Sequence, residues 1–236
     1  HGTGVMITYA GLTYSSKKLI IEYNTVTNSG YAGINFSGDS AIVRRNYVDK
    51  FGLNKTDGGG IYYGSGNVFS DMTIDSNIVI NAIANDEADG LPAGTASSAL
   101  HNIYIDHLST GGFTITNNTL THTDGGGIVI HGSRDVVIEN NTAYNCGKGV
   151  VFSEYSGSGG QIRYITMSNN IIVAKTLSQL CLWARSTTND FSQYGTFTTN
   201  FYAKPIDETN TFATLVNTWA NTYRNLSGWQ SYTSLD

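Results

Sequence analysis

Short apolar segments alternate with polar turns along the whole chain, and one spacing of the two recurs. An apolar residue, two variable positions, an asparagine, one variable position and a second apolar residue occur seven times, around Asn24, Asn46, Asn77, Asn118, Asn141, Asn170 and Asn200. Neighbouring asparagines are at least 22 residues apart, which is enough for three short strands and three turns. The repeat therefore predicts one coil of a right-handed parallel β-helix.

Four-residue segments with apolar residues at alternate positions follow these asparagines. They start at Gly33, Gly60, Asn102, Gly127, Gly149 and Leu180. A period of two places one side chain inward and the next outward. An antiparallel sandwich would show recurrent two-residue hairpin turns, which this sequence lacks. We predict an all-β fold, a single-stranded right-handed parallel β-helix of about seven coils.

The asparagine column predicts both the bends and the stacking of the coils. Asparagine tolerates left-handed backbone angles, and stacked copies can form an amide ladder. Equivalent residues then lie about 4.8 Å apart on successive rungs. One outward column is predicted to hold Ser37, Gly64, Asp106, His131 and Ser153, the next His107, Glu154 and Arg185, and another Asp57 and Asp124.

The repeat divides the chain into two parts. Residues 1–204 are expected to form the β-helix, with a truncated first coil, and residues 205–236 a C-terminal cap rich in aromatic residues. An acidic insertion at residues 84–101 is expected to wall a binding cleft, although a tolerated loop without function is the alternative. The chain starts at His1, so either a signal segment has been removed or the chain is a piece of a longer, multidomain protein.

Composition narrows the classes of partner. A formal charge of −5 argues against a nucleic-acid binder, and the apolar runs are too short to cross a membrane. Cys146 and Cys181 are expected to be free thiols, because two cysteines do not make a disulfide framework. The histidines show no metal-ligand spacing, so we expect no metal and no cofactor.

Two copies of an Asp-Gly-Gly-Gly-Ile motif, at Asp57 and Asp124, are the first candidates for chemistry. Glycine lets a ligand approach the backbone, but it also simply permits a sharp turn. Asp106 and His107 follow a predicted strand, beside the longest insertion, where a carboxylate and an imidazole suit acid–base work. Asp106 could instead cap the turn that follows.

Two further acid–base or substrate-binding candidates lie on neighbouring rungs. His131 could bind a sugar hydroxyl, tune the adjacent acid or be an ordinary surface histidine. Glu154 is expected about 10 Å from His107. Two carboxylates about 5 Å apart suit a retaining glycosidase and a separation of about 6.5–9.5 Å suits an inverting one, and the sequence does not choose between them.

These segments together resemble a known family. The Asp-Gly-Gly-Gly-Ile-Tyr motif at Asp57, the Ile-Tyr-Ile-Asp motif ending at Asp106 and the His-Gly-Ser-Arg-Asp motif at His131 are similar to β-helix proteins of bacterial polysaccharide degradation, nearest to glycoside hydrolase family 141. The resemblance implies a secreted bacterial enzyme, extracellular or periplasmic, with Asp57 and Asp106 as its catalytic carboxylates. The Asp106-His107 pair departs from the two successive acids often found in that family.

The leading hypothesis is therefore hydrolysis of a plant or algal polysaccharide. Tyr62 and Tyr104 would serve as stacking platforms and Arg185 as a further substrate contact. A calcium-dependent polysaccharide lyase is one alternative, kept open by Arg134, Arg185 and the acids of residues 84–101. A non-catalytic glycan-binding or adhesin solenoid is the other alternative.

Overall fold

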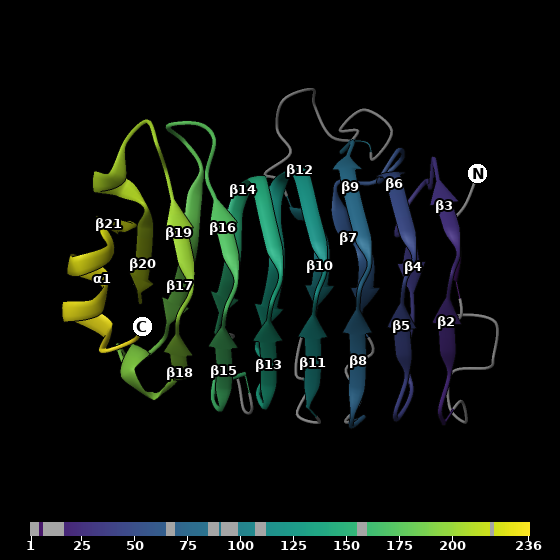
Figure 1. Ribbon diagram of the computed structural model, residues 1–236, viewed down its shortest axis with the longest axis horizontal. Helices are drawn as coiled ribbons and strands as arrows, with labels where there is room; N and C mark the ends of the chain where they lie inside the picture. The colour runs from purple at the N-terminus through teal and green to yellow at the C-terminus, as the bar shows by residue number, and fades with distance from the viewer. Residues whose placement is uncertain are drawn as a thin grey trace.

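The protein is a stack of parallel coils with three sheet faces (Figure 1). The computed structural model describes residues 5–6, 17–64, 69–84, 90, 99–106, 112–154, 160–217 and 220–236. The first face contains the parallel strands β1 (Val5–Met6), β4 (Ile34–Asn35), β7 (Asp57–Tyr63), β10 (Ala99–Ile105), β12 (Thr119–His131), β14 (Thr142–Ser153), β17 (Leu180–Ser186) and β20 (Phe212–Val216).

The other two faces complete each coil. The second face is a seven-stranded sheet of β2 (Ile20–Glu22), β5 (Ile42–Arg44), β8 (Met72–Asp75), β11 (Phe113–Thr116), β13 (Val136–Glu139), β15 (Ile165–Ser168) and β18 (Gly195–Thr198). The third contains β3 (Thr25–Thr27), β6 (Tyr47–Phe51), β9 (Ile78–Ala82), the first residues of β12 and β14, β16 (Ile171–Val173) and β19 (Phe201–Ala203). Strands β12 and β14 thus pass around the corner from the third face to the first. The predicted stack of about seven coils is confirmed.

Inward side chains of all faces form one apolar core. On the first face the buried column that starts at Ile34 continues through Ile61, Ile103, Ile128, Val150, Leu182 and Phe212. On the second face the column from Ile21 to Phe197 is buried in the same way. Each inward residue packs on its equivalents in the coils before and after, so burial of apolar surface stabilises the stack along its whole length.

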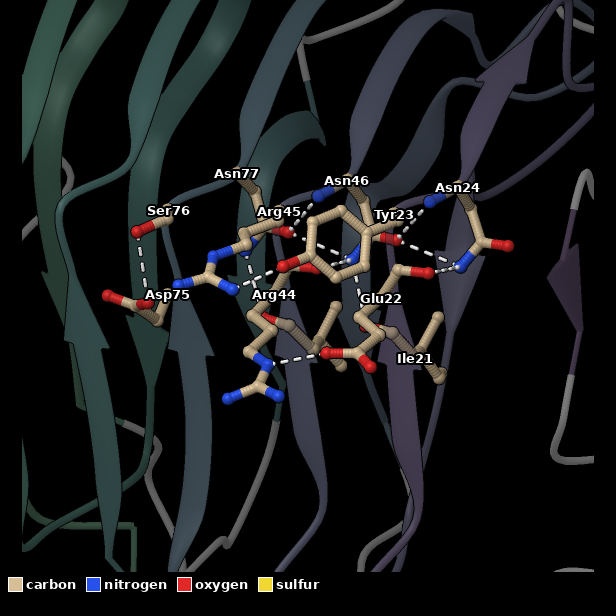
Figure 2. Close-up of polar contacts among 11 residues, drawn as sticks. Ile21, Glu22, Tyr23, Asn24, Arg44, Arg45, Asn46, Asp75, Ser76 and Asn77 are labelled. Carbon is tan, nitrogen blue, oxygen red and sulfur yellow. Dashed lines mark hydrogen bonds and ion pairs between the residues drawn. The ribbon is translucent and has the colours of Figure 1, made fainter.

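The predicted asparagine ladder is confirmed (Figure 2). Each ladder asparagine donates its Nδ2 hydrogen to the Oδ1 atom of the next, at 2.8–3.0 Å, from Asn24 to Asn200 without a break. The same Oδ1 atoms also accept the backbone N–H of the preceding coil's asparagine. Buried amides at this bend therefore have partners despite lying inside the stack.

The sequence analysis placed the left-handed conformation at the ladder asparagine. In the structure, the residue before each ladder asparagine adopts it instead. Positive φ values of 54–58° occur at Tyr23, Arg45, Ser76, Asn117, Asn140, Asn169 and Thr199. These residues point outward, where Arg45 and Tyr23 contact each other beside the Arg44–Glu22 ion pair (Figure 2). Asparagine is needed at the following position because its amide both donates and accepts along the stack.

The C-terminal segment closes one end of the core. Strand β20 still pairs in parallel with β17, so the last parallel strand lies beyond the predicted boundary at residue 204. Strand β21 (Thr222–Arg224) then pairs with β20 in antiparallel fashion, and helix α1 (Leu226–Thr233) places Trp229 against Phe212, with ring centroids 5.3 Å apart. The 3₁₀ turns η1 (Phe191–Gln193) and η2 (Glu208–Asn210) lie in the last connections.

The cysteines and the acidic insertion are the next features that the sequence singled out. Cys146 and Cys181 are buried free thiols, as predicted. Most of the insertion at residues 84–101 and of the first coil falls outside the described residues. Within the described part of the chain, no helix is long and apolar enough to span a bilayer, and no group of three potential ligands among His, Cys, Asp and Glu is arranged to hold a metal.

Candidate functional site

Asp106, which directly follows β10, is the centre of a polar cluster on the outer side of the first face. Its Oδ2 accepts a hydrogen bond from the Tyr62 hydroxyl and its Oδ1 accepts one from the Tyr104 hydroxyl, each at 2.9 Å. His131 Nδ1 lies 2.9 Å from the same Oδ1. We call Tyr62, Tyr104, Asp106 and His131 the Asp106 cluster.

The pairing of strands β7, β10 and β12 brings these four residues together. Tyr62 pairs with Tyr104, and Tyr63 pairs with Ile105, which pairs with Ile130. Asp106 therefore leaves β10 beside His131, the last residue of β12, as the sequence predicted. Tyr62 and Tyr104 rings lie 5.4 Å apart, so the hydroxyls of both reach the same carboxylate.

The cluster fixes the protonation states of its members. Burial alone would raise the pKa of Asp106, but hydrogen bonds from His131, Tyr62 and Tyr104 outweigh it and lower that pKa below its ordinary value. Burial and the Asp106 charge raise the pKa of both tyrosines, so each stays a hydroxyl donor. Asp106 is therefore an ionised acceptor, and a carboxylate facing Nδ1 requires that nitrogen to carry its hydrogen.

A cavity of about 180 Å³ adjoins the cluster. It is lined by His101, Tyr104, Gly126, Val129, His131, Lys148, Val151, Ser153 and Trp183. Tyr104, Val129, Val151 and Trp183 follow one outward column of the ladder, so an apolar strip forms the base of the cavity. Tyr104 is only 9% exposed and its hydroxyl is bound to Asp106, so it positions the carboxylate more than it offers a stacking face.

His101 is a neutral member of the cavity wall. Its Nδ1 accepts the backbone N–H of Gly126 at 2.8 Å, and its ring meets that of Tyr104 edge to face, with centroids 4.7 Å apart. Burial, with a smaller contribution from the Lys148 charge, lowers the pKa of His101 to about 3. The imidazole is therefore uncharged at neutral pH and acts as a hydrogen-bond acceptor.

The second glycine triplet, at residues 125–127, is required by close packing between coils. A Cβ on Gly125 would lie 2.3 Å from the Leu100 carbonyl oxygen and 2.5 Å from His101 Nδ1. The sharp-turn interpretation of this motif is thus sufficient to explain it. The triplet nevertheless serves the site, because it allows Gly126 to approach and hold His101.

A larger cavity of about 630 Å³ lies beyond the triplet. Its lining is mostly polar and consists of Asp124, Asn145, Gly147, Lys148, Thr176, Ser178, Gln179, Leu180, Asn221 and Tyr223. Asp124 is exposed here, away from the Asp106 cluster. Lys148 lines both cavities and therefore stands where they meet.

Asp57 lies at the opposite end of its strand from the cluster. It is exposed at the start of β7, and its ladder partner Ala99 is seven positions before Asp106. Its charge makes a minor contribution to the raised pKa of Tyr104, after burial and Asp106. The four contacting residues of the Asp106 cluster do not include Asp57.

Glu154, predicted as an acid–base or substrate-binding candidate, lies in the interior and lines neither cavity. Glu154 is 0% exposed, and its Oε1 pairs with Arg163 at 3.1 Å and accepts the Ile162 N–H. Its Oε2 accepts the N–H and hydroxyl of Thr187. The Glu154 carboxylate is stable in the interior because hydrogen-bond donors surround it. Glu154 and Asp190 together compensate the charge of Arg163.

The predicted register of β17 against β14 is wrong by one residue. Val150 pairs with Leu182 and Ser153 with Arg185, so Arg185 belongs to the His131 column and not to that of Glu154. Because a one-residue slip exchanges the two sides of a strand, Trp183 and not Leu182 faces outward. Arg185 does not line either cavity among the described residues.

Sequence reasoning missed three residues of the site, His101, Lys148 and Trp183. The correct β17 register would have placed Trp183 in the Tyr62 and Tyr104 column. His101 and Lys148 flank corners where the strand pattern is interrupted, so alternation gave no signal for them. His107 lies outside the described residues.

Comparison with known proteins agrees with this architecture. Residues 101–221, more than half of the chain, match the family described as the right handed beta helix region. No curated protein and no solved structure matches the chain. The matched segment contains His101, Asp106, His131, Lys148 and Trp183 and includes most of both cavity walls. The chain therefore belongs to the right-handed β-helix family, a fold common to carbohydrate-active enzymes and adhesins.

Proposed function

We propose that the protein is a carbohydrate-active enzyme that cleaves a glycan in the small cavity beside the Asp106 cluster. The observation that carries this proposal is the carboxylate of Asp106 held by three donors, one of them the imidazole of His131. An ionised carboxylate on Nδ1 holds the imidazole in one tautomer and one orientation. The apolar strip beneath, with Trp183 at its end, suits the flat side of a sugar ring.

His131 is the proposed proton-transferring group, with Asp106 as its positioning residue. The lowered pKa of Asp106 makes this carboxylate a poor general acid, so protonation of a glycosidic oxygen falls to His131. Hydrolysis remains the proposed reaction: the glycosidic bond breaks as its oxygen takes the proton of His131, water adds its hydroxyl to the anomeric carbon, and the proton that water loses returns to the imidazole. Asp124 lines the larger cavity and is assigned to substrate contact. Asp57, the predicted partner carboxylate, is exposed at the far end of its strand and is given no role in this reaction.

Non-catalytic glycan binding is the second candidate, because the apolar strip and the two cavities would bind a glycan without any reaction. Trp183 is half-buried and its Nε1 is bound to Asn221 Oδ1 at 2.8 Å, so the indole is held in place as a platform. Either function implies a carbohydrate partner and, as a further part of the proposal, a secreted or periplasmic location.

Activity on a panel of plant and algal polysaccharides tests the proposal. New reducing ends without unsaturated products indicate hydrolysis, whereas ultraviolet absorbance of unsaturated products indicates a lyase. His131→Ala and Asp106→Asn are expected to lower kcat by about 100-fold or more, because each removes part of the proton-transfer pair. Asp71→Asn, at an exposed bend with a positive φ that asparagine accepts, is the matched control and should leave kcat unchanged.

The outcomes separate the two candidates. Glycan binding that persists in all three variants, with no turnover by the parent protein, would replace the enzyme proposal by the binding module. Turnover that is insensitive to His131→Ala would place the reaction elsewhere on the solenoid.

A further inference from the structure

Lys148 is a cation without a compensating partner at the junction of the two cavities. Among the described residues, its ammonium forms no ion pair and no hydrogen bond. Its Nζ lies over the ring of Trp183, 5.9 Å from the ring centroid. Burial lowers the pKa of Lys148, and among the described lining residues of the two cavities the one carboxylate is that of Asp124, with which Lys148 forms no ion pair. Lys148 is half-buried, so its charge is partly desolvated and would be stabilised by a ligand that supplies the opposite charge.

Other buried cations of the chain are compensated within the protein. Lys204 is 1% exposed, and its Nζ donates to the carbonyl oxygens of Leu177 and Asn210. Arg163 is paired with Glu154 and Asp190. Lys148 differs from both residues because it lines the two cavities and binds no acceptor among the described residues.

The surroundings of Lys148 fit one anionic group within a mostly neutral ligand. Neither cavity has a second lysine or arginine among its described lining residues, and His101 is uncharged. The larger cavity offers amide and hydroxyl groups, including Gln179, whose amide is bound to Asn145, and the exposed carboxylate of Asp124, which disfavours further negative charge on the ligand there. Trp183, bound through Asn221, gives an aromatic surface next to the ammonium.

We propose that Lys148 binds the anionic group of an acidic sugar, a carboxylate or a sulfate ester, in a glycan that runs from the small cavity into the larger one. The proposal rests on the proposed function and defines its substrate class. The sugar carrying the charge would occupy the junction, its neighbour on one side would reach the Asp106 cluster, and its neighbour on the other would contact the polar lining of the larger cavity. An ammonium can serve either anion as a point charge.

Binding measurements with matched glycans test this assignment. Isothermal titration would compare a polyuronate, a sulfated galactan and the corresponding uncharged glycans. The parent protein is expected to prefer one acidic class, and added salt should weaken that binding alone. The carboxylate and sulfate arms identify the source of the charge.

Lysine variants connect the preference to this residue. Lys148→Gln should lower the affinity for the acidic glycan by about tenfold or more while changing the affinity for its neutral counterpart by less than about twofold. Lys148→Arg should restore most of the affinity. Lys175→Gln removes the same charge from an exposed position in the connection between β16 and β17 and should have little effect.

Each result bears on the assignment independently of catalysis. Equal affinity for acidic and neutral glycans, or an unchanged acidic affinity in Lys148→Gln, overturns it even if the protein cleaves neutral glycans through His131. A Lys148-dependent acidic preference without turnover supports it while the cleavage proposal fails. Equal affinity of the parent protein for acidic and neutral glycans overturns the assignment even if the Lys148 variants do not fold.

Discussion

At the scale of single residues, the fold depends on asparagines that each combine several hydrogen bonds. Asn118 donates to Asn141 Oδ1 and to the Ile74 carbonyl, and its own Oδ1 accepts from the amide and the backbone of Asn77. Asn200, at the end of the ladder, accepts from Asn170 but has no further ladder asparagine as acceptor. The sequence repeat predicts this stacking because the asparagine holds the same place between two apolar residues in every coil, although the coils differ in length.

Replacement of Asn118 by alanine should destabilise the protein by roughly 3 kcal/mol, because it leaves buried donors and acceptors of two neighbouring coils without partners. Asn200→Ala should cost less, since fewer groups lose a partner. Urea unfolding of both variants measures the difference. Equal losses would mean that the ladder contributes little beyond its individual bonds.

His101 should make stability depend on pH. Its folded-state pKa of about 3 is below the ordinary value near 6.5, so the unfolded chain binds a proton first as the solution is acidified. The stability that this group contributes is fully present above about pH 6.5 and is lost as the pH falls toward 3, by up to about 1.4 kcal/mol per pH unit.

His101→Gln keeps an acceptor for the Gly126 N–H and does not titrate. Urea unfolding between pH 7 and pH 4 should therefore show a steeper loss of stability in the parent than in this variant. Parallel curves would argue that the imidazole is not kept neutral in the folded state.

At the scale of secondary-structure elements, register decides which side chains can act. The alternating pattern correctly gave an outward Asp106 and an outward His131 on neighbouring strands, because these strands follow the repeat closely. In β17 the same pattern also fits a register displaced by one residue, since apolar residues occupy three successive positions from Leu180 to Leu182. Hydrogen-bond pairing with β14, which no local pattern records, selects Trp183 as the outward residue.

The register of β17 can be tested by a pair of truncations. Leu182→Ala should destabilise the protein by roughly 2–5 kcal/mol, because it opens a cavity in the core. Trp183→Ala should cost clearly less stability, as its ring is only half-buried, but should weaken glycan binding. Urea unfolding and glycan titration of both variants separate the two expectations, and a larger stability loss for Trp183→Ala would favour the displaced register.

At the scale of the whole molecule, a solenoid has ends that must be closed. Strand β21 pairs antiparallel with β20, and α1 follows at this end of the stack (Figure 1). Trp229 of α1 is completely buried and stacks on Phe212. The aromatic C-terminal segment predicted this cap, because an exposed last coil would leave apolar side chains and strand edges in water.

Trp229→Ala should therefore destabilise the protein by roughly 3–5 kcal/mol and promote association through the uncovered end. Unfolding in urea and light scattering would measure the two effects. Tyr223→Ala, at an exposed position of β21, is the control. A monomeric Trp229→Ala protein of unchanged stability would show that the coil end needs no cover.

The sequence by itself determined the coil, because periodic spacing and alternating polarity act on every rung in the same way. It determined the ladder, the inward columns, the cap and the neighbourhood of Asp106 and His131. Only the tertiary structure decided that Glu154 is held inside by Arg163, and that His101, Lys148 and Trp183 meet at one cavity. The physical reason is that these contacts arise at corners and between coils of unequal length, where hydrogen-bond pairing sets the final register.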